Sequence, residues 1–250
     1  MKPPVAVQLY SVRESAAQDL AGALRRIADM GYVGVEFAGL YDHEPAEVRA
    51  LLDDLGMVCC SAHSPVPTEE TVEGLLDIAR TLGYSYHVLG WGPPQFASAE
   101  EIQKVAAEAE AAYALFKGTG IKVGVHNHYW EFDHLVDGRY PHELFMEAAP
   151  NMLAELDTYW VTVGGADPAT ELRKLGARAP LLHIKDGPGV RGTDMLPIGK
   201  GIMDWPLVFA EAGTAEWMIV ELDSCATDMF EALADSYAYL VGNGYAEGRK

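Results

Sequence analysis

The stretch IADMGYVGVEF (27–37) runs from an apolar helix end through a glycine into a short run rich in β-branched and aromatic residues. Glycine commonly ends a helix because it enters the left-handed backbone region without a Cβ clash. The same order of helix, glycine and β-rich run recurs in four more segments: LLDDLGMVCCSAH (51–63), IARTLGYSYHVLG (78–90), LFKGTGIKVGVHNH (115–128) and FAEAGTAEWMIVEL (209–222). The glycine is Gly31 in the first stretch and Gly56, Gly83, Gly120 and Gly213 in the others. The recurrence predicts a chain that alternates helices with strands.

Eight strands are predicted, at 4–10, 32–37, 57–63, 84–90, 121–128, 152–158, 179–185 and 216–222, with a last helix over about 226–241. Strands that alternate with helices form a parallel sheet. Eight such units in 250 residues match the size of a (β/α)8 TIM barrel, here one domain over 1–250. The alternative, an open doubly wound sheet, needs a glycine-rich phosphate loop after the first strand, where Gln8-Leu-Tyr-Ser11 stands instead.

The composition of the chain argues against several classes of binding partner and against a membrane-spanning protein. Asp and Glu number 37 against 18 Lys and Arg, a formal charge of −19, which disfavours nucleic-acid and anionic-membrane partners. No stretch approaches the 18 or more apolar residues of a spanning helix, and the N-terminal MKPPVAVQLYS lacks a signal core, so we expect a cytoplasmic protein. Three cysteines fit no disulfide or zinc framework and are expected as buried thiols.

Polar residues close the predicted strands: Gln8, Glu36, His63, His87, His126, Asp157, His183 and Glu221. In such barrels the active site lies at the carboxyl ends of the strands. A single histidine at a strand end is more often a hydrogen-bonded structural residue than a ligand, and Glu36 or Glu221 alone is compatible with an exposed carboxylate. Their convergence changes this, because several buried like charges need a counter-ion. Carboxylate and imidazole together suit Mn²⁺, Zn²⁺, Co²⁺ or Mg²⁺, so we predict one divalent metal ion.

The segments VQLYSV (7–12), VGVHNHYWEF (123–132), AELDTYWV (154–161), LLHIKDG (181–187), IGKGIMDW (198–205) and VELDS (220–224) resemble the xylose isomerase-like TIM-barrel family. That family includes sugar (phosphate) isomerases and epimerases and inosose dehydratase-like proteins. The resemblance covers essentially the whole chain. It implies a carbohydrate substrate, one divalent metal held by four side chains from strands five to eight, and compatibility with a homo-oligomer.

Carried over by motif, the metal ligands implied by the resemblance are Asp157, His183 and Glu221 from strands six, seven and eight. Many relatives place the strand-five glutamate where Gly124 stands here. We assign that role to Glu131 in HNHYWEF, with His126 or His128 as the alternative ligand.

The chemistry implied is removal of a proton next to a carbonyl, with Glu131 and Glu221 as the catalytic carboxylates on either side of the sugar. The residues assigned to substrate binding are His63, His126, His128, Lys185 and Trp91. Lys185 is equally well a salt-bridge partner of Asp186 or Asp223, and Trp91 equally well packs within its loop. Arg191 and Lys200, in the glycine-rich loop after strand seven, either meet a phosphate or belong to a lid, and the acidic charge favours an unphosphorylated substrate.

The first prediction is therefore a metal-dependent isomerase or epimerase acting on a sugar, keto-sugar or cyclitol. The same carbanion also supports β-elimination, which gives a lyase or dehydratase on a keto-sugar or inosose. A non-catalytic sugar-binding barrel is a further alternative. A phosphodiester hydrolase would draw on Glu36 and His63 for extra metal ligands, but the charge opposes a DNA substrate.

Overall fold

The computed structural model describes residues 2–249 and contains a closed barrel of eight parallel strands in the order β1 to β8. The strands are β1 (Val5–Gln8), β2 (Gly34–Phe37), β3 (Val58–His63), β4 (Tyr86–Leu89), β5 (Lys122–His126), β6 (Leu153–Asp157), β7 (Leu181–Ile184) and β8 (Trp217–Val220). Closure is made by β1 pairing with β8, where Val5 lies opposite Met218. The predicted (β/α)8 architecture is confirmed, with each strand inside its predicted range.

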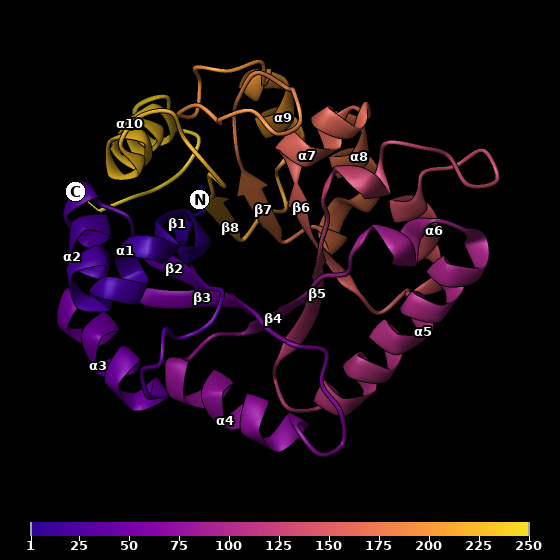
Figure 1. The fold of residues 1–250 in the computed structure, drawn as a ribbon, viewed down its shortest axis with the longest axis horizontal. Helices are drawn as coiled ribbons and strands as arrows, with labels where there is room; N and C mark the ends of the chain where they lie inside the picture. The colour runs from indigo at the N-terminus through magenta and orange to yellow at the C-terminus, as the bar shows by residue number, and fades with distance from the viewer. Residues whose placement is uncertain (1, 250) are drawn as a thin grey trace.

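Helices surround the barrel (Figure 1). They are α1 (Arg13–Gln18), α2 (Leu20–Met30), α3 (Pro45–Leu55), α4 (Val72–Leu82), α5 (Ala99–Phe116), α6 (Pro141–Ala148), α7 (Thr158–Gly164), α8 (Pro168–Leu175), α9 (Trp205–Glu211) and α10 (Met229–Gly242). Short 3-10 helices follow several strands: η1 (Leu9–Val12), η2 (Pro93–Phe96) and η3 (Tyr129–Glu131), with η4 (Gly176–Arg178) before β7. None of the helices within residues 2–249 combines the length and the apolar character needed to cross a membrane.

Three of the five glycines that were predicted to end a helix do so. Gly31, Gly56 and Gly83 cap α2, α3 and α4 in the left-handed conformation. Helix α5 instead ends with a cap at Lys117, before Gly120, and α9 is capped by Ala212, before Gly213. These two helices therefore end without a left-handed glycine at the cap. Ser98 caps the start of α5, where its hydroxyl accepts a hydrogen bond from the Glu101 amide at 3.3 Å.

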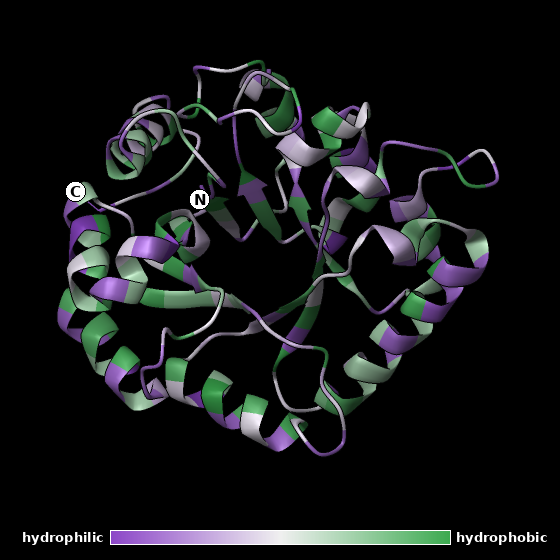
Figure 2. Ribbon diagram, viewed as in Figure 1, coloured by the Kyte–Doolittle hydropathy of each residue, from purple (hydrophilic) through white to green (hydrophobic). Residues whose placement is uncertain are grey.

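The strand residues divide between two cores. Those facing the helices join the main apolar cluster, and Figure 2 shows largely hydrophobic strands inside helices of mixed character. A smaller cluster fills the barrel itself, made of Ala6, Cys60, Tyr86, Val88, Leu181 and Ile219. Because side chains alternate along a strand, the inward residue two positions after Leu181 is His183, and the one after Ile219 is Glu221.

The connection from β7 to α9 is anchored by one buried carboxylate. Asp186 accepts hydrogen bonds from the amides of Gly187, Gly199 and Met203 and from the Trp205 indole, at 2.9 to 3.3 Å. Gly199, Met203 and Trp205 all belong to the GKGIMDW element (199–205), so the Asp186 carboxylate holds this element in place. Asp204 caps α9 by accepting a hydrogen bond from the Leu207 amide at 3.3 Å, and the helix begins at Trp205 with Pro206 as its second residue.

Candidate metal and active site

His183 lies at the centre of a buried carboxylate cluster at the carboxyl end of the barrel. Its Nε2 lies 2.7 Å from Glu36 Oε1 and 3.1 Å from Glu155 Oε2, and its Nδ1 lies 2.9 Å from Glu221 Oε2. Burial lowers the pKa of His183, but the Glu155 and Glu36 carboxylates outweigh it and raise that pKa well above the ordinary value. The ring is therefore held between three acidic groups from three different strand ends.

His63 adds a second imidazole to this cluster. Its Nε2 lies 2.5 Å from Glu155 Oε2 and 3.3 Å from Glu36 Oε1, and its ring stacks on His183 with centroids 5.4 Å apart. Burial lowers the pKa of His63, yet Glu36 and Glu155 raise it to about 10 overall. The two histidines together lower the pKa of Glu36 well below its usual value despite the burial of that carboxyl group.

His126 takes the strand-five position in the cluster. Register places it opposite Glu155, and Asp157 opposite His183. His126 Nδ1 lies 3.3 Å from Glu155 Oε2, and His126 Nε2 lies 3.9 Å from Asp157 Oδ2. Burial and the neighbouring His183 and His128 lower the pKa of His126 well below normal, which leaves a neutral imidazole. A neutral imidazole is the form that binds a metal.

Lys185 balances the carboxylates on the other side of His183. The buried Nζ lies 2.7 Å from Glu221 Oε2, 2.9 Å from Asp223 Oδ1 and 3.1 Å from Asp157 Oδ2. Of the two predicted salt-bridge partners, Asp223 is therefore confirmed, whereas Asp186 is used in the loop anchor. Burial raises the pKa of Asp157 to about 6 even with Lys185 beside it.

The donor atoms fit a divalent cation. Two overlapping sets of side chains have ligand atoms within 4.8 Å of one another: His63, His126, Glu155 and His183, and His126, Asp157, His183 and Glu221. Within residues 2–249, Glu155 Oε1 and the neighbouring Glu36 Oε2 are buried without a hydrogen-bond partner, and Asp157 Oδ2 has an ion pair with Lys185 but no hydrogen bond. Unpaired buried carboxylate oxygens are costly, and a bound cation removes that cost.

Glu131 lies apart from both sets. Its Oε2 accepts a hydrogen bond from the His128 amide at 2.9 Å and caps η3, and neither cluster of donor atoms found within residues 2–249 includes it. Burial raises its pKa well above the usual value. The geometry thus brings together three of the four predicted ligands and replaces Glu131 with His126, the alternative left open by the sequence.

A cavity of about 270 Å³ opens beside the cluster, lined by Tyr10, Ala38, His63, Gly90, His126, His128, Lys185, Glu221 and Asp223. Four of the five predicted substrate-binding residues line it. Trp91 does not: its indole donates a hydrogen bond to Glu108 on α5 at 2.7 Å, and its ring packs 5.8 Å from Phe145. The Trp91 side chain therefore packs against α5 and α6, which agrees with the packing alternative left open by the sequence.

The strand-end residue His87 and the loop residue Arg191 both lie outside the cavity. His87 faces the helices, where its ring lies 4.7 Å from Phe116 and its Nε2 lies 3.1 Å from the Pro65 carbonyl oxygen. Arg191 pairs with Asp133 at 2.8 Å and stacks over Tyr129 at 4.0 Å, and it is not among the residues that line the cavity. Sequence reasoning missed Glu155 as a site residue, although strand alternation places it on the inward face with Asp157. It also missed Tyr10 and Asp223, which line the cavity from positions just beyond β1 and β8.

Comparison with known proteins agrees with this architecture. The model of the xylose isomerase-like TIM barrel family matches residues 24–237. The chain belongs to the xylose isomerase-like TIM barrel family. Comparison with curated protein sequences gave no match.

Solved structures of similar fold cover nearly all of this xylose isomerase-like barrel. A sugar phosphate isomerase/epimerase from Parabacteroides distasonis is 26% identical, with a TM-score of 0.84 over 99% of this chain and 96% of that one. The probable 3-DHS dehydratase AsbF from Bacillus anthracis is 16% identical, with a TM-score of 0.75 over 98% and 100%. An IOLI protein with a bound zinc atom is 16% identical, with a TM-score of 0.75 over 99% and 100%.

Proposed function

We propose that the protein is a divalent-metal-dependent carbohydrate isomerase or epimerase that removes a proton from the carbon next to a carbonyl. The observation that carries this proposal is the cluster of His126, Asp157, His183 and Glu221, whose ligand atoms lie within 4.8 Å of one another beside an open cavity. These four side chains would hold the ion. A bound divalent cation supplies positive charge that stabilises the developing enediolate. The known sugar isomerase/epimerase of similar fold supports the substrate class.

The chain's own groups supply the proton transfers. Glu221 is the proposed base: it lines the cavity, and Lys185 and His183 lower the pKa of its carboxyl group strongly despite burial. When it takes the proton, the C–H electrons form the enediolate double bond and the carbonyl π electrons move to oxygen. Lys185 Nζ, which also lines the cavity, is placed to donate a hydrogen bond to that oxygen.

On the side of the substrate away from Glu221, the proposed contacts are histidines. His63 and His128 line the cavity, and the pKa of His63 is raised to about 10, so it is a proton donor at neutral pH. His128 is stacked on Trp130 with centroids 4.1 Å apart, and burial lowers its pKa to about 3, so it presents a neutral ring to a hydroxyl group. We assign return of the proton to His63 in place of Glu131, whose carboxyl group serves as a helix cap.

Elimination is the second candidate function. The same enediolate expels a leaving group from the next carbon if one is present there, which gives a dehydratase or lyase. Because a probable dehydratase has a similar fold, the test below also looks for the product of elimination. Which reaction occurs depends on the substrate and on whether the enediolate is reprotonated before the leaving group departs.

The test is a screen of aldoses, ketoses, 3-keto-sugars and inososes in deuterated water, read by NMR with Mn²⁺, Zn²⁺, Co²⁺ or Mg²⁺ added. An isomerase or epimerase places deuterium on the carbon next to the carbonyl, and a lyase gives an unsaturated product. Metal analysis after gentle purification should find about one ion per chain. A protein that takes up none of these metals, or that converts a sugar without exchanging this proton even at partial turnover, would contradict the proposal.

A further inference from the structure

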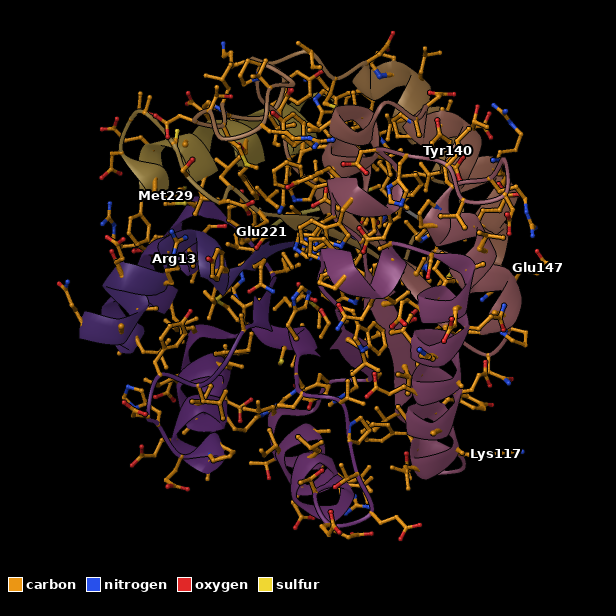
Figure 3. The ribbon with its side chains drawn as sticks, turned by 45° about the vertical axis from the view of Figure 1, so that its right-hand side comes forward. Arg13, Lys117, Tyr140, Glu147, Glu221 and Met229 are labelled. Carbon is orange, nitrogen blue, oxygen red and sulfur yellow. The ribbon has the colours of Figure 1, made fainter. Side chains whose placement is uncertain are left out.

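A second cavity adjoins the proposed reaction cavity at the same end of the barrel. It has a volume of about 310 Å³ and lies between the β1–α1 and β8–α10 connections. Its walls include Arg13, Glu14 and Ser15 on one side and Ser224 and Phe230 on the other. Arg13 and Met229, which both line it, are labelled in Figure 3 close to Glu221 of the reaction cavity. The proposed reaction does not use this cavity.

The two cavities share a boundary. Asp223 lines both, and its carboxylate binds Lys185 while its backbone carbonyl accepts a hydrogen bond from Arg13 at 3.1 Å. The Arg13 guanidinium also lies over the Tyr10 ring at 4.2 Å, and Tyr10 lines the reaction cavity. A ligand that crosses this boundary therefore meets an exposed aromatic ring, an arginine and a carboxylate in succession.

The chemistry of the second cavity suits a neutral polyhydroxylated group. Its charged lining residues are of both signs, two arginines and three carboxylates: Arg13, Arg26, Glu14, Asp223 and Asp228. Arg26 is already compensated, because it lies 3.8 Å from Asp228 and over the Phe230 ring at 3.5 Å. Asp223 is likewise paired with Lys185, so Arg13 and Glu14 remain and the lining has no net charge to favour an anion, whereas sugar hydroxyls both donate to carboxylates and accept from guanidinium groups. The half-buried Met229 offers apolar contact for the C–H face of a ring.

Volume favours two linked rings over one large group. Each cavity, at about 270 and 310 Å³, is near the lower limit of roughly 300–1,000 Å³ for sites that bind drug-sized ligands. We propose that the second cavity is a subsite for the neighbouring sugar unit of a disaccharide-sized glycoside whose reacting ring occupies the cavity beside the metal cluster. This inference rests on the proposed function for the position of the reacting ring.

The experiment measures binding and not turnover. Dissociation constants of glucose, maltose, cellobiose, trehalose and glucose 6-phosphate are determined by calorimetry on the full chain with Mn²⁺ present. We expect at least one disaccharide to bind about tenfold more tightly than glucose, which corresponds to about 1.4 kcal/mol. Ser224→Trp places an indole in the second cavity, and should reduce that ratio to about one.

Ser15→Trp fills the same cavity from the opposite wall and serves if Ser224→Trp fails to fold. Ser85→Trp is the matched control, since Ser85 is an exposed serine just before β4, at the other end of the barrel, and should keep the ratio. The subsite is contradicted if no disaccharide exceeds glucose, if glucose 6-phosphate alone gains affinity, or if both filled variants keep the preference. A persistent disaccharide preference without proton exchange would instead contradict only the proposed reaction.

Discussion

The two ends of the barrel interior are built from the same strands but do opposite things. Leu181, the first residue of β7, and Ile219, which lies opposite His183 on β8, pack in the apolar cluster that fills the barrel. Two residues further along these strands, on the same inward face, stand His183 and Glu221, buried among carboxylates. The apolar end gains free energy from burial, whereas the charged end must offset the desolvation of every ionised group.

This contrast teaches where the two functions of the fold reside. The apolar cluster consists of uncharged side chains that contribute to stability by their burial. At the charged end, one carboxylate oxygen each of Glu36 and Glu155 has no hydrogen-bond partner within residues 2–249, which suits the binding of a cation there. A metal ion bound at this end would therefore contribute to stability as well as to chemistry.

The largest effect is expected from Glu221→Gln, which changes the charged end of the barrel and leaves the apolar end as it is. Removing the proposed base should lower turnover by at least about a hundredfold, the lower bound for general-base catalysis. Glu231→Gln, an exposed position on α10, is the matched control. Kinetics with the substrate found in the deuterium screen measure the effect, and thermal unfolding checks that the variant folds. Wild-type turnover in Glu221→Gln would remove this residue from the mechanism.

The converse change is Leu181→Ala at the apolar end. Loss of a fully buried leucine should lower the free energy of unfolding by about 2–5 kcal/mol. The melting temperature should fall by roughly 2–4 °C per kcal/mol for a chain of this size, while metal content stays at the wild-type level. Leu207→Ala, at a site that is 60% exposed, is the control. If Leu181→Ala loses the metal as well, the two ends are energetically coupled and the contrast drawn above is too simple.

Metal removal tests the charged end directly. A cation present at a hundred times its dissociation constant stabilises the folded state by about 2.7 kcal/mol. Chelation should therefore lower the melting temperature by several degrees, and added Mn²⁺ or Zn²⁺ should restore it. Asp157→Asn should weaken this response, because Asp157 belongs to the proposed ligand set. Identical melting curves with and without chelator would argue that the buried carboxylates are satisfied by other means.

The smallest expected effect is on the pH dependence of stability, and it follows from the pKa values of two buried histidines, His63 and His142. Carboxylates raise the pKa of His63, whereas burial and then Arg178 and Lys174 lower the pKa of His142 to about 3. A neutral buried histidine contributes stability that is present above the unfolded-state pKa near 6.5 and is lost as pH falls from there toward 3. The slope is at most about 1.4 kcal/mol per pH unit.

Denaturant titrations of wild type and His142→Gln between pH 7 and 4, in roughly unit steps, measure this slope. The variant should show a shallower loss of stability below pH 6.5, while the control His43→Gln, at an exposed position, should follow the wild type. Parallel curves for wild type and His142→Gln would show that this histidine is protonated in the folded state without cost.

The fold was predictable because its signals are local. A glycine after an amphipathic helix and the β-rich run that follows can be read within a dozen residues, and eight of these strands leave few topologies. The same local reading failed at His87, since tyrosine, histidine, valine and leucine in 84–90 give no contrast between the two faces of β4. Trp91 shares this ambiguity, because one indole suits either a cavity or a helix face.

The candidate site was only partly predictable because it depends on register and on local caps. Asp157 and His183 are directly paired across β6 and β7, and Glu221 follows β8, so motif and alternation both found them. Glu131 was assigned from a motif, but its carboxyl group closes η3 on the His128 amide, a local hydrogen bond that spacing does not reveal. Glu36 was among the predicted strand-end residues, whereas Glu155 completes the cluster from the middle of β6 and was missed because sequence reasoning concentrated on the residues that end each strand.

The anchoring of the β7–α9 connection by Asp186 has a consequence for engineering. One carboxylate holds Gly187 at the start of the segment and Gly199, Met203 and Trp205 toward its end. Between these anchors, Met195 and Ile198 are buried, and their amides donate hydrogen bonds to the Ser224 carbonyl oxygen and the Ser236 hydroxyl. Only the stretch 190–194 is exposed throughout, and it forms an insert on the surface of this connection. We expect this insert to accept exchange for stretches of different length and composition, which makes it the natural place to graft new recognition onto the barrel without disturbing its chemistry.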